Sequence, residues 1–146
     1  MEEIKIKKIN KEAKFPTHGS EYSAGYDLYA CIPTETIVKP FSTLEVGTGL
    51  AMALPEGTFG AIYARSGLAT REHLRPANCV GIIDSDYRGE IKIVIHNDSE
   101  EIQKITPGER VAQLVLQKYI PMSFQEIDEL DETARGEGGF GSTGMN

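Results

Sequence analysis

The sequence predicts an all-β fold, closed or sandwiched, for a single domain of 146 residues. Three observations support this prediction: apolar and polar residues alternate in many short segments, Gly and Pro separate these segments, and helical patterns are scarce. A chain of this length can bury a core without disulfide or metal staples. The two cysteines, Cys31 and Cys79, are too few for a disulfide framework or a metal cluster, so we expect free thiols.

Short alternating segments recur along the chain. In residues 89–98, Ile91, Ile93 and Ile95 fall on one face and polar or smaller residues on the other, which predicts a half-buried strand. Turn residues such as Pro107 and Gly108 bound these segments. The other predicted strands are residues 3–9, 35–38, 43–54, 58–64, 110–119 and 124–130.

One short helix is predicted over residues 66–74, where Ser66 would cap the first turn and good helix formers follow. For residues 124–136 the sequence leaves a second interpretation open. Ile127, Leu130 and Ala134 would share one face of an amphipathic helix there.

The charge of the chain narrows the function classes. A net charge of -7 argues against a nucleic-acid polymer as partner, because such binding relies on clustered Lys and Arg. A small anionic substrate is still compatible with this charge if arginines, backbone N–H groups or a divalent cation offset the repulsion between the acidic chain and the anion. No apolar run is long enough to cross a bilayer, and the charged N-terminal segment lacks the apolar core of a secretory signal. We therefore expect a cytoplasmic protein without a membrane partner.

Residues 81–91 predict a strand, a tight turn and a returning strand, with Asp84 and Asp86 at the turn. Two interpretations are open for these aspartates. Both can be turn residues that bond their own backbone, or one can be a general base.

Residues 63–70 bring Arg65, Ser66 and Gly67 to the start of the predicted helix, where free N–H groups suit phosphate. The plain alternative is a capping serine beside a surface arginine. Asp27 stands among apolar neighbours, so it bonds locally, faces a polar cavity or chelates a metal. Gln113 lies on the polar side of an alternating strand and says little alone.

The C-terminal segment 134–146 contains five glycines and cannot fold by itself, so we divide the chain into a β domain (1–133) and a glycine-rich flexible arm (134–146). The segment can be a disordered end. It can also form half of a nucleotide site, since Arg135, Ser142 and Thr143 are phosphate donors and Phe140 offers a stacking face. It lacks the lysine and spacing of a Walker P-loop.

Five segments in order resemble the motifs of the homotrimeric dUTP pyrophosphatase family, the dUTPases: A-G-Y-D-L, R-S-G-L-A, G-I-I-D-S-D-Y-R-G-E, G-E-R-V-A-Q-L and R-G-E-G-G-F-G-S-T-G. They span residues 24–144 and depart from the family at Ala64, where proline is common. The resemblance implies a jelly-roll-like distorted β-barrel, a homotrimer with sites at subunit interfaces, and Mg²⁺ bound with the substrate. It also implies hydrolysis of dUTP to dUMP and pyrophosphate, which limits uracil in DNA and supplies dUMP for thymidylate synthesis.

The resemblance also implies a role for each motif residue. Asp84 would activate the attacking water, Tyr87 would pack on the deoxyribose, and Asp27 would hold Mg²⁺ through water. The remaining positions would bind substrate: Asn78 and Gly81 at the uracil hairpin, Arg65, Ser66, Gly67 and Gln113 at the phosphates, and Arg135, Phe140, Gly141, Ser142 and Thr143 in an arm that closes as a lid, with Phe140 over the uracil.

Three other functions would use the same sequence features. A dCTP deaminase-like enzyme would share the fold but needs a proton shuttle beside the exocyclic amine, which these motifs do not supply. A dUTP-gated binding protein could use the same lid to signal to a partner. A non-catalytic β scaffold is disfavoured because Asp84 and the whole arm are present.

Overall fold

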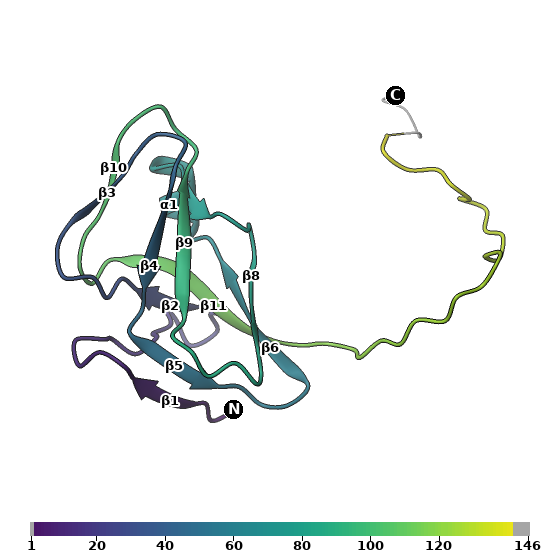
Figure 1. The fold of residues 1–146 in the computed structure, drawn as a ribbon, viewed down its shortest axis with the longest axis horizontal. Coiled ribbons are helices and arrows are strands. Elements are labelled where there is room, and N and C mark those ends of the chain that lie inside the picture. Colours follow the sequence, from purple (N-terminus) through teal and green to yellow (C-terminus); the bar gives the residue numbers. More distant parts are fainter. Residues whose placement is uncertain (1, 142–146) are drawn as a thin grey trace.

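The computed structural model describes residues 2–141 and is built from short strands and one short helix (Figure 1). The prediction of an all-β fold is confirmed. The elements follow one another as β1 (Lys5–Lys8), β2 (Tyr26–Tyr29), β3 (Thr36–Val38), β4 (Thr43–Gly47), β5 (Leu50–Ala53), β6 (Thr58–Tyr63), α1 (Ser66–Arg71), β7 (Leu74–Pro76), β8 (Gly81–Asp84), β9 (Lys92–Asn97), β10 (Gln103–Ile105) and β11 (Arg110–Lys118).

All strand pairings between these elements are antiparallel. The largest sheet has the order β2-β11-β6-β8, and a three-stranded sheet has the order β4-β9-β7. The pairs β1-β5 and β10-β3 complete the body. The described residues contain no helix that is long and apolar enough to cross a membrane.

The core lies between the inner faces of the sheets. The predicted alternation in β9 is confirmed, because Ile91, Ile93 and Ile95 are buried while Lys92 and Val94 are exposed. A buried polar residue, Asn97, ends β9. Its side-chain amide donates to the carbonyls of Val38 and Glu101 at 3.1 and 2.7 Å, so its burial is compensated and β9 is fastened to the turn after β3.

Two predicted elements are shorter than expected. The strand predicted over residues 43–54 divides into β4 and β5 at Thr48 and Gly49, and Gly49 adopts the left-handed φ of 68° that favours glycine. The helix predicted over 66–74 ends at Arg71, because His73 also has a positive φ and redirects the chain into β7. Arg65, not Ser66, is the N-cap residue, and it makes no side-chain cap bond, so the predicted Ser66 cap is wrong.

Both predictions for the segment around residues 124–130 are wrong. Residues 119–141 form an arm without helix or strand, which leaves the body after β11 (Figure 1). Phe124 is 91% exposed and Leu130 82%. Alternation stabilises a strand only when a neighbouring strand and a core receive it, and the described part of the chain offers this segment neither.

Candidate active site

A groove of about 900 Å³ runs along the sheet beside β2, β11 and the start of α1. It gathers five residues that the motifs singled out far apart in the sequence: Asp27, Arg65, Ser66, Gly67 and Gln113. The antiparallel register explains the meeting, since Asp27 in β2 stands opposite Gln113 in β11, which stands opposite Tyr63 in β6. Residues 65–67 follow directly after β6.

Charge in this groove is concentrated and positive. The Asp27 carboxylate accepts from Arg65 Nε at 2.7 Å through one oxygen and from Arg110 Nη1 at 3.3 Å through the other. Arg71 also lines the groove. Three guanidinium groups and one carboxylate therefore line the groove, a balance that suits an anion in a chain whose net charge is -7.

The sequence analysis did not single out Arg71 or Arg110. A signal for Arg110 was available, because it lies in the same strand and motif as Gln113. Arg71 carried a weaker signal. It falls one turn after Gly67 on the predicted helix, and its guanidinium packs against Gly67, where an added Cβ would meet Arg71 Nη2 at 2.8 Å.

Gln113 is held in one orientation. Its Nε2 donates to the Ala64 carbonyl at 2.9 Å, and its Oε1 faces Gly25, where a Cβ would collide with it. The glycine before Tyr26 is therefore required by close packing at this point. Because Ala64 directly precedes Arg65, the Gln113 bond also fixes the backbone that carries the groove arginine.

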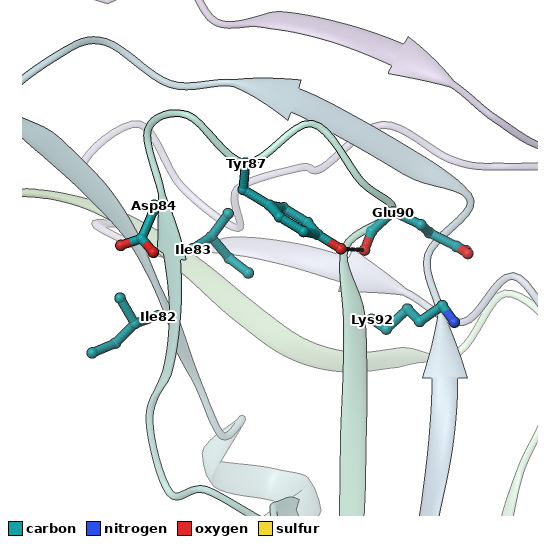
Figure 2. Close-up of a pocket in the computed structure, with 6 residues that line it drawn as sticks. All are labelled: Ile82, Ile83, Asp84, Tyr87, Glu90 and Lys92. Atoms are coloured by element: carbon teal, nitrogen blue, oxygen red, sulfur yellow. Dashed lines mark hydrogen bonds between the residues drawn. The ribbon is translucent and has the colours of Figure 1, made fainter.

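A second concave region lies around residues 74–94. One cavity of about 310 Å³ is lined by residues that include Pro76, Asn78, Gly81 and Val94. A smaller one of about 190 Å³ is lined by six residues that include Asp84 and Tyr87 (Figure 2). The two cavities share Ile82, Ile83 and Lys92, so they adjoin.

The predicted strand, turn and returning strand of residues 81–91 are present, but β8 and β9 belong to different sheets. β8 pairs with β6 at the edge of the four-stranded sheet, whereas β9 lies between β4 and β7. Within the described chain the second edge of β8 therefore has no strand partner. Unpaired N–H and C=O groups along such an edge are ready to bond a planar ligand.

Two hydrogen bonds of Tyr87 shape the turn after β8. Tyr87 N donates to the Asp84 carbonyl at 3.1 Å, and the Tyr87 hydroxyl donates to the Glu90 carbonyl at 2.9 Å. Figure 2 shows Ile82 and Asp84 pointing to one side of β8, with Ile83 and Tyr87 on the other. Within residues 2–141 no hydrogen bond engages either the Asp84 or the Asp86 carboxylate, so the interpretation of both as backbone-bonding turn side chains is not met.

Asp84 and the groove share one face of the four-stranded sheet. One row of paired residues across β2, β11 and β6 is Asp27, Gln113 and Tyr63. Four residues further along β11, a second row across β11, β6 and β8 is Gln117, Phe59 and Asp84. Three strand spacings and four residues of rise separate Asp27 from Asp84 by roughly 20 Å. No described residue that lines the groove also lines either hairpin cavity. Within one chain the groove and the hairpin cavities are therefore separate surfaces.

The three predicted arm residues that the structure describes, Arg135, Phe140 and Gly141, do not line either surface in the single chain. Arg135 Nε donates to the Gly138 carbonyl at 2.7 Å within a local turn, and the Phe140 ring is fully exposed. Gly141 has a φ of 87°. Ser142 and Thr143, the other predicted phosphate contacts, lie outside the described residues.

The domain is an all-β jelly roll that carries an arginine-lined groove and a split hairpin, the two strands β8 and β9 that lie in different sheets. These features suit a small phosphorylated ligand. The dUTPase family model matches residues 11–144. Over 142 residues the chain is 49% identical to the deoxyuridine 5'-triphosphate nucleotidohydrolase of Corynebacterium glutamicum, covering 97% of this chain and 94% of the relative. It is 45% identical to that of Syntrophotalea carbinolica, covering 97% of each chain.

Among solved structures, the dUTPase of Staphylococcus bacteriophage 80alpha with dUPNHPP aligns with a TM-score of 0.85 at 26% identity, covering 99% of this chain and 100% of that chain. The chain belongs to the dUTPase family.

Proposed function

We propose that the protein hydrolyses dUTP to dUMP and pyrophosphate by attack of an Asp84-activated water on the α-phosphate. The observation that carries the proposal is the Asp84 carboxylate, exposed and without a hydrogen bond to residues 2–141, at the end of the split hairpin in a dUTPase-family chain. Its reaction would keep uracil out of DNA by removing dUTP and would provide dUMP for thymidylate synthesis.

The split hairpin is the binding site for uracil in this proposal. The free edge of β8 at Gly81 and the Asn78 side chain line the 310 Å³ cavity. Main-chain donors and acceptors match uracil's edge. Cytosine is rejected because its hydrogen-bonding pattern is reversed at two atoms, which would leave buried groups unpaired. A narrow hairpin would also leave no room for the methyl group of thymine.

Tyr87 would pack its ring against the deoxyribose. The hydroxyl bond to the Glu90 carbonyl holds the ring over the smaller cavity. A fixed ring at this point leaves no space for a ribose 2′-hydroxyl, so the residue would select deoxyribonucleotides.

The groove would bind the phosphates. Four of the predicted residues converge there: Arg65, Ser66, Gly67 and Gln113. Arg65 supplies positive charge for a triphosphate. Because a triphosphate repels nucleophiles, the reaction needs in-line positioning and cationic groups that offset charge at the phosphates. The ion pairs of Asp27 keep Arg65 in place before substrate arrives.

Asp84 would act as the general base. A carboxylate without a cationic partner accepts the proton of the attacking water, and it must lie within about 2.6–3.2 Å of that water or reach it through another. The water's oxygen then bonds the α-phosphorus, and the bond from that phosphorus to the bridging oxygen of pyrophosphate breaks.

The residues present fit Mg²⁺ brought by the substrate. The described chain contains no cluster of three or more His, Cys, Asp or Glu side chains that could hold a metal. Mg²⁺ usually keeps several waters and binds through one or two carboxylates plus substrate phosphates, and Asp27 lines the phosphate groove. Asp27 would therefore hold the hydrated ion through water. Bound there, the ion would neutralise phosphate charge.

A homotrimer would join the two surfaces. Asp84 lies roughly 20 Å from Asp27 in its own chain, too far to act on phosphates held beside Asp27. The hairpin of one subunit facing the groove of a neighbour removes this difficulty, and Ile82, 65% exposed on the same sheet face, would be covered. Residues 134–146 would close over the nucleotide as a lid that excludes bulk water, while residues 119–133 connect the lid to the body, which ends with β11. A cytoplasmic location stays a prediction.

The test is to incubate the full chain with dUTP and with dCTP and to measure pyrophosphate and ammonia separately. We expect pyrophosphate and dUMP from dUTP, with no ammonia from either nucleotide. Ammonia from dCTP would indicate a deaminase of the same fold. Binding of dUTP without any product would favour the regulatory binding protein.

A further inference from the structure

We propose that Arg75, paired with Asp98, is a positioning residue for base selection: it holds the loop 77–80 in the shape that discriminates uracil from cytosine. The proposal rests on the proposed function, because it assigns the adjoining cavity to the base. Arg75 itself does not line that cavity, whereas Pro76, Ala77 and Asn78 do.

The guanidinium of Arg75 makes contacts on two sides. Nε and Nη2 donate to the two oxygens of Asp98 at 2.6 and 3.0 Å, a bidentate pair. Nη1 donates to the carbonyls of Pro76 and Ala77 at 3.1 and 3.3 Å and lies 3.6 Å from Cys79 Sγ. One planar group therefore joins the end of β9 to the main chain of the loop.

The Asp98 side of this clamp is anchored in the core. Asp98 directly follows Asn97, whose buried side chain is bonded to the carbonyls of Val38 and Glu101. Asp98 N donates to the His73 carbonyl at 2.9 Å, and His96 Nε2 lies 3.5 Å from an Asp98 oxygen. The hydrogen bond from Arg75 lowers the pKa of Asp98, so the carboxylate stays ionised at neutral pH. Asp98 is thus a fixed point for Arg75.

The loop needs such support. Cys79 adopts a φ of 62°, which is uncommon for a residue with a Cβ and persists only where surrounding contacts impose it. Local bonds from Cys79 N to the Pro76 carbonyl and from Val80 N to the Asn78 carbonyl shape the turn. Arg75 binds the carbonyl of Pro76 as well, so its position determines where the Asn78 side chain and the free edge of Gly81 are presented.

A role in folding alone predicts a different outcome. The Arg75 and Asp98 side chains are 34% and 42% exposed, and pairs this accessible contribute little to folding stability. Lysine keeps the charge of arginine but has no planar fork, so it cannot bond Asp98 twice and two carbonyls at once. Arg75→Lys therefore separates positioning from charge.

The experiment compares full-length wild type with Arg75→Lys, Asp98→Asn, the double variant, and Lys104→Gln as control. Lys104 of β10 forms an ion pair at 2.8 Å with Glu35, just before β3, and this pair is even more exposed than that of Arg75 and Asp98. For each protein kcat and KM are measured with dUTP and kcat/KM with dCTP, together with the midpoint of thermal unfolding.

We expect Arg75→Lys and Asp98→Asn each to lower kcat/KM for dUTP about tenfold through KM, the loss of roughly one oriented hydrogen bond. The value for dCTP should stay near that of wild type, so the dUTP to dCTP ratio falls by the same factor. The double variant should resemble the single ones because both changes remove one interaction. The control should match wild type throughout.

Wild-type selectivity in both variants, whatever their thermal midpoints, would overturn the proposal. If one variant fails to fold, the other tests the same contact from its opposite side. If wild type releases no pyrophosphate from dUTP, the proposed function fails instead. Calorimetric binding of dUMP and dCMP to the same variants then decides whether Arg75 governs base selection.

Discussion

The arginine-lined groove beside β2 and β11 and the split hairpin of β8 and β9 border the same four-stranded sheet. They are built in different ways. The groove draws side chains from β2, β11 and the residues after β6, and its character comes from guanidinium groups around Asp27. The hairpin is one continuous stretch whose character comes from unpaired main chain, a left-handed Cys79 and an exposed Asp84. Under the proposed function, charge of the first kind would attract any triphosphate, whereas shape of the second kind would select one base.

If these roles hold, phosphate affinity and base selection are properties of separate parts of the molecule. Changes in the groove should weaken all triphosphates to the same degree. Changes in the hairpin should alter turnover or selectivity and leave phosphate binding in place.

The largest effect is expected for Asp84→Asn. The amide keeps the shape of the side chain but cannot accept a proton from water, so turnover of dUTP should fall by about 10³-fold or more. Binding of a non-hydrolysable dUTP analogue should stay near wild type by calorimetry. Asp86→Asn is the matched control, since Asp86 is an exposed aspartate of the same turn, and it should keep its activity. Unchanged turnover in Asp84→Asn would remove Asp84 from the mechanism.

Removal of the arm residues 134–146 should have the next largest effect. The body should fold and keep its thermal midpoint, because none of the described residues 134–141 belongs to the core, while loss of the lid should cost roughly 10²-fold in kcat/KM. Pyrophosphate release and differential scanning calorimetry measure the two properties on the same sample. Full activity in the shortened chain would refute the lid.

The alternation of apolar and polar residues predicted those strands that are long enough to show this pattern. Residues 91, 93 and 95 are buried as their alternation indicates, and β11 spans nearly all of the predicted segment 110–119. Three short strands, β2, β7 and β10, were not predicted; they have four, three and three residues, although the equally short β3 was found. The apolar positions of 124–130 failed as a predictor because nothing in the described chain packs on them.

The motif residues were easier to predict than their neighbours. Asp27, Arg65 and Gln113 meet in one groove because antiparallel register brings distant motifs together. Arg71 and Arg110 were missed because an arginine in a charged chain carries no distinctive pattern. Arg75 was missed for a stronger reason: its contacts with Asp98 and with two carbonyls depend on tertiary geometry.

Arg65→Gln tests the groove. Its loss removes charge-assisted bonds worth about 1.5–3 kcal/mol, so kcat/KM for dUTP should fall by roughly 10–100-fold. The value for dCTP should fall by a similar factor, so the ratio of the two stays constant, in contrast to Arg75→Lys. Lys118→Gln, which removes an exposed charge at the end of β11, is the control. A changed ratio in Arg65→Gln would mean that the groove also takes part in base selection.

Tyr87→Phe should have the smallest effect. The ring stays but loses its bond to the Glu90 carbonyl, an interaction of about 0.5–1.5 kcal/mol. A ring that swings more freely admits a 2′-hydroxyl more readily, so the ratio of kcat/KM for dUTP to that for UTP should fall about two- to tenfold, with dUTP turnover nearly unchanged. Tyr119→Phe, on the exposed arm, controls for removal of a hydroxyl. An unchanged ratio in Tyr87→Phe, together with a collapsed ratio in Tyr87→Ala, would show that the ring excludes ribose without help from Glu90.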